Sequence, residues 1–233
     1  MKKTREWPEA EEYEERYRGE KRDRLIGRVL RLFLLLLLAA VMIFLGFRIF
    51  MSSYYPEEAR GILPTEGVRR YCLSLPGEEI AAKRQKLRFN YDNTREGYFF
   101  AGELVVIPGC STVQVSMRYN RSTLQKLAKK FEDFDPEAEK PFTYRAVFSV
   151  GETEDKKPRT LWADPAGEKH SSYLFYEYDR LSFEGLPLEE IYWIRVEVMR
   201  PGDSVPVCYI CVYENTEKYH EFTDFTVKKD EVK

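Results

Sequence analysis

The amino-acid sequence predicts a mainly β protein: an antiparallel β-sandwich, immunoglobulin-like or jelly-roll, with one short helix, preceded by a single transmembrane helix. Three observations carry this prediction. An apolar segment near the N-terminus is long enough to cross a bilayer. Beyond residue 68, short segments alternate between apolar and polar residues and are bounded by turn residues. One segment in that region has helical spacing instead.

The apolar segment predicts a membrane anchor at residues 25–51. Residues 32–47 carry no charge and form a helix of about 24 Å, and the flanking Arg31 and Arg48 have stems that extend the span toward the ~30 Å of a hydrocarbon core. A cleaved signal peptide is the competing interpretation. The run is longer than the ~7–15 residues of a signal peptide, and no small-residue cleavage site follows it. We therefore expect an uncleaved anchor.

Charge asymmetry predicts the orientation of this anchor. Basic residues near the apolar run are more numerous before it than after it: Arg16, Arg18, Lys21, Arg22, Arg24, Arg28 and Arg31 against Arg48 and Arg60. The positive-inside rule then places the N-terminus in the cytoplasm. The expected location is the cell membrane, single-pass, with the C-terminal domain extracytoplasmic and the lipid bilayer as a partner.

The chain divides into five predicted parts. Residues 1–24 form a charged cytoplasmic arm whose i,i+4 ion pairs favour a helix that runs into the transmembrane segment at 25–51. Residues 52–67 contain prolines and glycines and are expected to form a stalk. The β-sandwich follows at 68–228, and 229–233 is a charged tail. Two roles stay open for the arm: support of topology, or docking into a larger membrane complex.

Alternation and β-rich composition predict nine strands in the external domain. Their ranges are 70–75, 86–91, 97–107, 112–119, 142–150, 173–183, 191–199, 205–213 and 222–227. The 205–213 strand is apolar on both faces and is therefore expected at the centre of a sheet. A helix is predicted at 122–134, capped by Asn120 or Ser122 and covering one end or edge of the sandwich. A helical turn is predicted at 78–84.

The four cysteines, Cys72, Cys110, Cys208 and Cys211, are all predicted to lie outside the cytoplasm, where disulfides persist. Cys208 and Cys211 are three residues apart in a predicted strand and point to opposite faces, which disfavours a bond between them. If all four pair, two connectivities remain: 72–208 with 110–211, or 72–211 with 110–208. Free, buried thiols are the alternative.

Composition excludes several classes of function. The chain has 233 residues, 43% of them hydrophobic, and a net charge of -2. It lacks the basic surplus of a nucleic-acid-binding protein, and its two histidines and four cysteines offer little for a metal site. The sequence contains no phosphate-binding loop, dinucleotide fingerprint, zinc-protease or serine-hydrolase motif. We therefore expect no cofactor and no enzymatic activity.

The remaining expectation is a binding or assembly module of the cell envelope, with a protein or glycan as its partner. Exposed aromatic residues would form a glycan-binding patch, and the candidates are Trp162, Tyr173, Tyr176 and Tyr178, for which core packing is the alternative. A second hypothesis is an envelope enzyme that uses Cys208 or Cys211 with His170 or His220. A third is a subunit of a larger membrane complex that docks through the arm.

Overall fold

The computed structural model describes residues 10–53, 56, 61–94, 96–151, 159–214 and 222–232. The chain separates into two compact units, residues 1–54 and residues 55–233.

The first unit is one long helix, α1 (Ala10–Ser53), of 44 residues, or about 66 Å. Within it, Arg24–Phe50 is long and apolar enough to cross a membrane; its most apolar 18-residue stretch has a mean hydropathy of 2.8 and is not buried in the structure. A helix of this composition near the N-terminus fits a membrane anchor or a signal sequence. The expected continuation of the arm helix into the apolar segment is confirmed from Ala10 onward.

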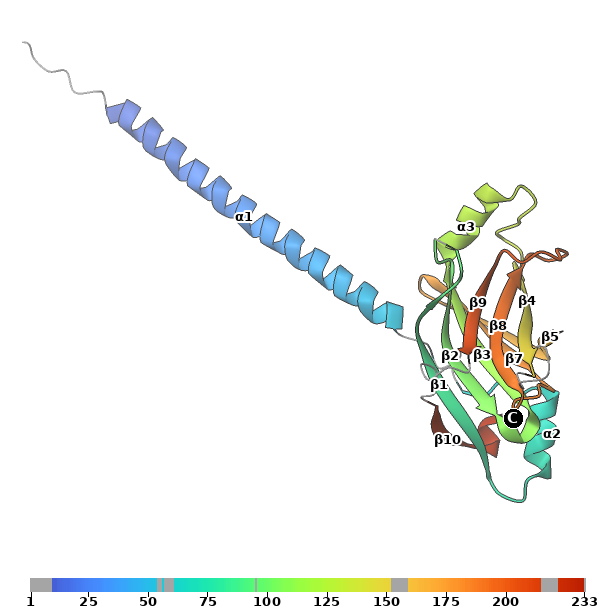
Figure 1. The fold of residues 1–233 in the computed structure, drawn as a ribbon. Helices are drawn as coiled ribbons and strands as arrows, with labels where there is room; N and C mark the ends of the chain where they lie inside the picture. The colour runs from blue at the N-terminus through green and yellow to red at the C-terminus, as the bar shows by residue number, and fades with distance from the viewer. Residues whose placement is uncertain are drawn as a thin grey trace, which may run out of the picture. The chain divides into compact units, whose positions relative to one another are not determined.

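The second unit contains two antiparallel sheets in a sandwich-like layout (Figure 1). The six-stranded sheet has the order β10 (Thr223–Lys228), β1 (Glu79–Tyr91), β2 (Phe99–Ile107), β3 (Thr112–Asn120), β7 (Tyr176–Phe183) and β6 (Gly167–Tyr173). The four-stranded sheet has the order β5 (Arg159–Ala163), β4 (Thr143–Val150), β8 (Ile191–Met199) and β9 (Cys208–Glu214). Both sheets are antiparallel throughout, as the alternating pattern predicted.

The main core lies between the inner faces of the two sheets. Val113, Val115 and Met117, which alternation placed on one face of β3, are all fully buried there. The rings of Phe99, Tyr119 and Phe142 meet at one end of this core, with centroids 4.9 to 5.2 Å apart. Offset and edge-to-face aromatic packing of this kind contributes beyond simple burial of area.

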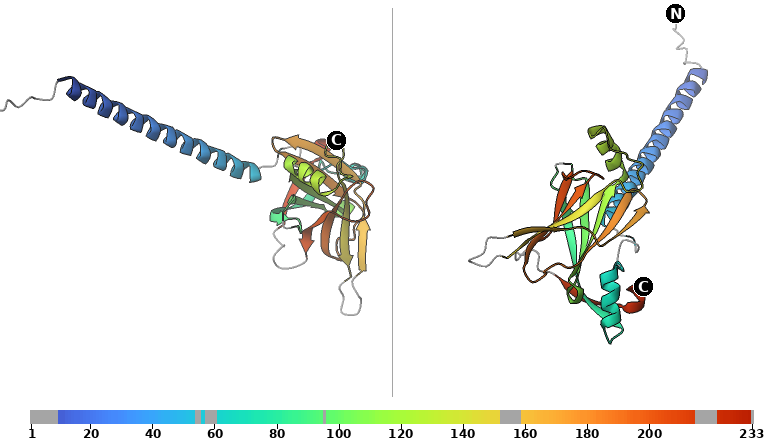
Figure 2. Two further views of the ribbon diagram at one scale, coloured as in Figure 1. Left: turned by 90° about the horizontal axis from the view of Figure 1, so that it is seen from above. Right: turned by 90° about the vertical axis from the view of Figure 1, so that its right-hand side faces the viewer.

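The predicted helix is confirmed as α3 (Arg121–Lys130), which begins directly after β3. The Asn120 side chain accepts a hydrogen bond from the backbone N–H of Ser122, so Asn120 is the cap. Leu127 is completely buried in the main core. Figures 1 and 2 show α3 at one end of the sandwich and α2 (Glu66–Ser74) at the other.

Two local predictions near the start of this unit are wrong. The segment 70–75 is the end of α2, up to Ser74, and the residue after it rather than a strand, because Val68 and Cys72, one helical turn apart, are the residues of α2 that are buried in a second cluster on the outer face of the large sheet. Residues 78–84 lie in β1 rather than in a helical turn. Ile80 and Ala82 alternate into that second cluster between β10 and β2, so pairing overrides local helix propensity.

Two strands, β6 and β5, were not predicted, and the predicted strand at 173–183 has different bounds in the structure. β6 has the polar sequence GEKHSSY and lies at an edge of the large sheet, where little of it is buried and alternation is absent. β5 is an edge strand with exposed or half-exposed residues only. The segment 173–183 is the end of β6, a turn, and β7. Although 205–213 was expected at the centre of a sheet, β9 is an edge strand whose apolar residues face the main core.

Residues 61–65, inside the predicted stalk, pack against the outer face of the six-stranded sheet. The backbone N–H of Leu63 donates to Gln114 Oε1 at 2.7 Å, and Gln114 Nε2 donates to the Leu63 carbonyl at 2.8 Å. Ile62 and Leu63 are buried. Thr65 donates its hydroxyl to Glu184, which also accepts from the Gly67 N–H. The chain is therefore fastened to β3 before α2 begins.

Candidate functional site

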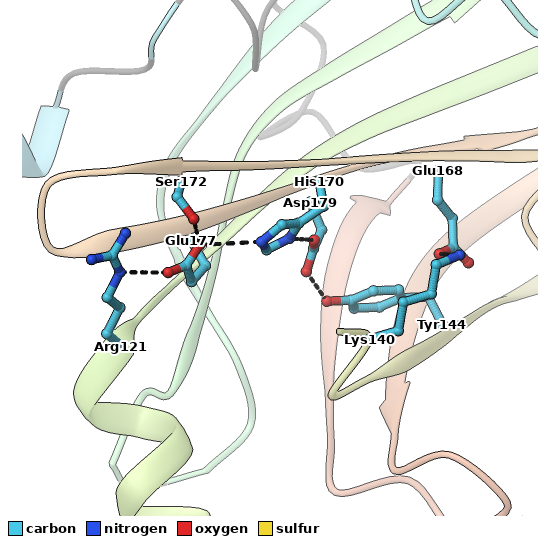
Figure 3. A network of polar contacts seen from close by, with 8 residues as sticks. All are labelled: Arg121, Lys140, Tyr144, Glu168, His170, Ser172, Glu177 and Asp179. Atoms are coloured by element: carbon cyan, nitrogen blue, oxygen red, sulfur yellow. Dashed lines mark hydrogen bonds and ion pairs between the residues drawn. The ribbon is translucent and has the colours of Figure 1, made fainter. Parts of the chain in front are cut away.

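The candidate site is the β6–β7 hairpin, where a polar cluster and an apolar tip lie next to each other. Tyr173 pairs with Tyr176, so only Leu174 and Phe175 connect the two strands. The register places His170 opposite Asp179 and Ser172 opposite Glu177. Because side chains alternate along a strand, these four residues share one face of the hairpin (Figure 3).

His170 lies between two carboxylates. Its Nδ1 is 2.7 Å from Asp179 Oδ1 and its Nε2 is 3.2 Å from Glu177 Oε2. Both carboxylate side chains are close to nine-tenths buried, whereas the histidine side chain is 45% exposed. The imidazole therefore covers two acidic groups at the edge of the sheet.

The two carboxylates connect the hairpin to other elements. Asp179 Oδ2 accepts a hydrogen bond from the Tyr144 hydroxyl, which comes from β4 of the opposite sheet. Glu177 accepts from Ser172 and from Arg121 Nε at the start of α3, the latter at 2.5 Å. Figure 3 shows Arg121 and Tyr144 reaching the hairpin from opposite ends of the cluster, whereas Ser172 belongs to the hairpin itself. The cluster thus joins an edge strand, the opposite sheet and α3.

The electrostatics follow from this arrangement. The hydrogen bond with Asp179 and the nearby charges of both carboxylates raise the pKa of His170 above its usual 6.5, although partial burial opposes them. Burial, reinforced by the Asp179 charge, raises the pKa of Tyr144 well above its ordinary value, so the phenol stays protonated and donates. Protonation of the imidazole is therefore favoured by its position between two largely buried carboxylates.

The polar groups of this cluster are used to hold the hairpin against its neighbours. Both ring nitrogens of His170 face carboxylates, and the Ser172 hydroxyl already donates to Glu177. The hollow beside it, lined by Tyr144, Glu168 and His170 among others, has a volume of about 50 Å³, enough for one or two water molecules. In the part of the chain that the structure describes, no group of three His, Cys, Asp or Glu side chains is arranged to hold a metal ion.

The tip of the hairpin is apolar and exposed. Tyr173 is 39% exposed, Leu174 45% and Phe175 54%. Leu174 has φ 52°, in the left-handed region that glycine and asparagine favour, at a cost of about 1 kcal/mol for a leucine. The tip is nevertheless well supported, because the Arg121 N–H donates to the Phe175 carbonyl at 3.1 Å.

The predicted aromatic patch is only partly assembled. Tyr173, Tyr176 and Tyr178 belong to the hairpin, and the rings of Tyr176 and Tyr178 have centroids 6.4 Å apart. Tyr178 is buried, with 1% exposed. Trp162 is 68% exposed but lies on β5, in the other sheet. The sequence reasoning missed Leu174 and Phe175, although the run of four large apolar residues after a polar segment was a usable signal.

All four cysteines are free thiols, so neither predicted pairing is formed. Cys72 belongs to the second cluster, and Cys110 packs against it. Cys208 points into the main core, whereas Cys211 is half-buried on the opposite face of β9, as the odd spacing predicted. Burial raises the pKa of each thiol.

The structure does not bring a cysteine to His170. β9 packs near β1 and β2, at one side of the sandwich, whereas His170 lies on β6, the opposite edge strand of the large sheet. His220, the other histidine considered for a thiol site, falls outside the described residues.

Comparison with known proteins adds no relative: no family model matches the sequence, and neither a curated protein nor a solved structure is significantly similar to it.

Proposed function

We propose that this chain is a single-pass membrane protein that displays an immunoglobulin-like or jelly-roll sandwich outside the cytoplasm, as a binding or assembly module of the cell envelope. One observation carries the proposal: Arg24–Phe50 forms a helix that is long and apolar enough to cross a membrane, and its most apolar stretch is not buried in the structure. An apolar surface of this length needs a nonaqueous environment, and a bilayer supplies one.

The second unit supports separate roles for the helix and the β domain. It has a core of its own between its two sheets, built without any residue of α1. A domain with a complete core has no need of the long helix for its own stability. The helix is therefore free to serve as the anchor. The basic residues that precede the span place the arm in the cytoplasm.

The edge strand β5 is the surface that we assign to a protein partner. In the described part of the chain it pairs only with β4, which leaves its other edge open. Trp162 and Leu161 are 68% and 39% exposed on it. An open edge offers backbone hydrogen bonds to an added strand, and a neighbouring tryptophan is a typical interface anchor.

Fractionation of the full chain tests the anchor. We expect the protein to stay with membranes after alkaline extraction and its intact mass to include residues 1–50. A Leu36→Arg variant puts a charge at the centre of the span, at a cost of about 3 kcal/mol, and should release the protein or reduce insertion, whereas Leu36→Ala should not. A mature chain that has lost its first ~50 residues would show a cleaved signal sequence instead.

Protease protection tests the orientation. Cells with an intact cell membrane, whose outer layer lets protease through, are treated with protease from outside. The protease should cut the sandwich and spare the arm. Digestion of the arm from that side would reverse the proposed topology.

Photo-crosslinking tests the partner surface. A photoreactive amino acid at Trp162 of the full chain should give one discrete crosslinked protein, which mass spectrometry then identifies. The matched position is Val205, which is 71% exposed but lies in the turn before β9. Equal patterns from both positions would show that β5 is not a selective surface.

A further inference from the structure

We propose that the tip of the β6–β7 hairpin, residues Tyr173 to Tyr176, enters the interface of the bilayer in which the chain is anchored. This inference rests on the proposed anchorage and extends it. It assigns a lipid surface, rather than a protein or glycan, as the partner of the hairpin tip.

The composition of the tip fits a lipid interface. Leu174 and Phe175 project at the turn with about half of each side chain exposed, and Tyr173 precedes them. Leucine and phenylalanine are the side chains with which interfacial segments bury into the boundary of the acyl chains. Tyrosine is enriched where headgroups meet water. Among the other exposed apolar residues described in this unit, Leu73 and Val205 stand singly, whereas Leu161 and Trp162 form a second exposed pair on the edge strand β5.

The backbone gives an independent indication. Leu174 is one of two described non-glycine residues with positive φ, and it occupies a turn position where glycine would be unstrained. This leucine holds the strained position although 45% of it remains exposed. Strained residues that the surrounding structure holds in place gather at ligand-contact sites. An exposed leucine in this strained position is explained if a ligand outside the fold contacts it.

The tip is held ready for contact. The guanidinium of Arg118 lies 4.5 Å from the centroid of the Phe100 ring and 4.9 Å from that of Tyr176, which fixes the base of the turn. The Arg121 N–H holds the Phe175 carbonyl from the start of α3. A loop fixed in its bound conformation loses little entropy on contact.

Chain length brings the tip within reach of lipid. Residues 54–62, between the end of α1 and Leu63, span at most about 30 Å when fully extended. Leu63 is bonded to Gln114, which pairs with Ser182 of β7. From Ser182 to Tyr176 the strand covers about 20 Å. A tether of this length keeps the bilayer at a high effective concentration around the tip, which no soluble partner has.

Quenching by brominated lipid tests this contact in the full chain. A Phe175→Trp variant is reconstituted into phosphatidylcholine vesicles with or without bromine on the acyl chains. Val205→Trp is the matched control, and the wild-type chain supplies the background of its three native tryptophans. Bromine in both leaflets makes the result independent of the orientation of insertion. We expect the added tryptophan at 175 to lose about half of its emission, and the one at 205 to lose almost none.

A second substitution separates contact from mere proximity. Adding Leu174→Asp to Phe175→Trp should remove most of the quenching, because a carboxylate opposes entry into the acyl region. Circular dichroism of the same sample reports whether the sandwich remains folded. Loss of quenching with an unchanged spectrum supports the proposal.

Three other outcomes overturn it. Equal quenching at 175 and 205 in a vesicle-bound chain removes the hairpin contact while the anchor stands. The tryptophan at 175 could instead show a blue-shifted emission that bromine does not quench, with the shift disappearing when the protein is diluted in lipid. That result would assign the tip to a second copy of the chain. A chain that does not float with the vesicles at all would remove the anchor itself.

Discussion

His170 and Asp179 lie directly opposite each other on β6 and β7, and the Nδ1 atom of the imidazole is 2.7 Å from the Asp179 carboxylate. The same carboxylate accepts the Tyr144 hydroxyl from the opposite sheet. One cross-strand pair therefore holds the edge of the large sheet and also joins the two layers of the sandwich. Its strength depends on the charge of the imidazole, which gives the first prediction.

The contribution of His170 to stability should decrease as the pH rises. The pKa of His170 is raised in the folded chain, so the protonated form is favoured by folding. That stabilisation is fully present below about pH 6.5, the unfolded pKa, and is lost as the pH rises through the higher folded value. Because the side chain is partly exposed, we expect at most about 1 kcal/mol. Denaturant unfolding of wild type and His170→Gln at pH 5.5 and 8.5 measures it. A difference that grows with pH would contradict the assignment.

Removing the Asp179 carboxylate should cost more than removing the Tyr144 hydroxyl. Asp179→Ala leaves the buried hydroxyl of Tyr144 without its acceptor and His170 without its closest partner, which predicts a loss of about 2–3 kcal/mol. Tyr144→Phe also removes a hydrogen bond from the remaining carboxylate, with an expected loss of about 1–2 kcal/mol. The two changes should be non-additive in a double-mutant cycle. Additive losses would show that the hydroxyl and the carboxylate act independently.

Leu174→Gly should stabilise the sandwich in detergent while weakening its contact with lipid. Glycine adopts the positive φ of this turn without strain but raises the entropy of the unfolded chain, so a net gain of about 0.5 kcal/mol is expected. Ser111→Gly is the control, because Ser111 has the same φ of 52° at an exposed position and no apolar side chain to lose. Equal stabilisation in both, with lipid quenching reduced only in Leu174→Gly, is the expected result. Destabilisation by Leu174→Gly alone would show that the leucine packs within the fold.

The four thiols should react in an order set by their burial. In the folded chain near pH 7, Cys110 and Cys211 should be alkylated before Cys72 and Cys208, because the latter pair is buried. Burial also raises the pKa of the Cys208 thiol, which keeps it protonated. After unfolding without reductant, mass spectrometry should find all four labelled. A requirement for reductant would show a disulfide, as the sequence allowed.

Strong periodicity in the sequence predicted the centre of the fold. β3 has apolar residues at every second position, and the face with Val113, Val115 and Met117 lines the main core, while the other face carries the buried polar residues Gln114, Ser116 and Arg118. α3 was recognised from its spacing and its cap. β5 and β6 were not predicted because these edge strands bury few residues. Their sequences therefore lack the alternation that marks a strand.

The site was less accessible from the sequence. His170 and Asp179 are nine positions apart, and only the hairpin register makes them neighbours. The register depends on the turn at Leu174 and Phe175, and those residues lack the glycine or asparagine that marks a tight turn. Tyr144 reaches the cluster from the other sheet, and no local pattern encodes such a contact. The aromatic residues were noticed, but their division between exposed tip, buried face and β5 is a tertiary property.

The attachment of Leu63 to Gln114 determines how the sandwich bears mechanical load. Gln114 belongs to β3, which has β2 on one side and β7 on the other. Tension arriving from the N-terminal side of the chain is therefore delivered to an interior strand. The two hydrogen bonds to Gln114 take this load first, and only after they break does the load pass along α2 to β1.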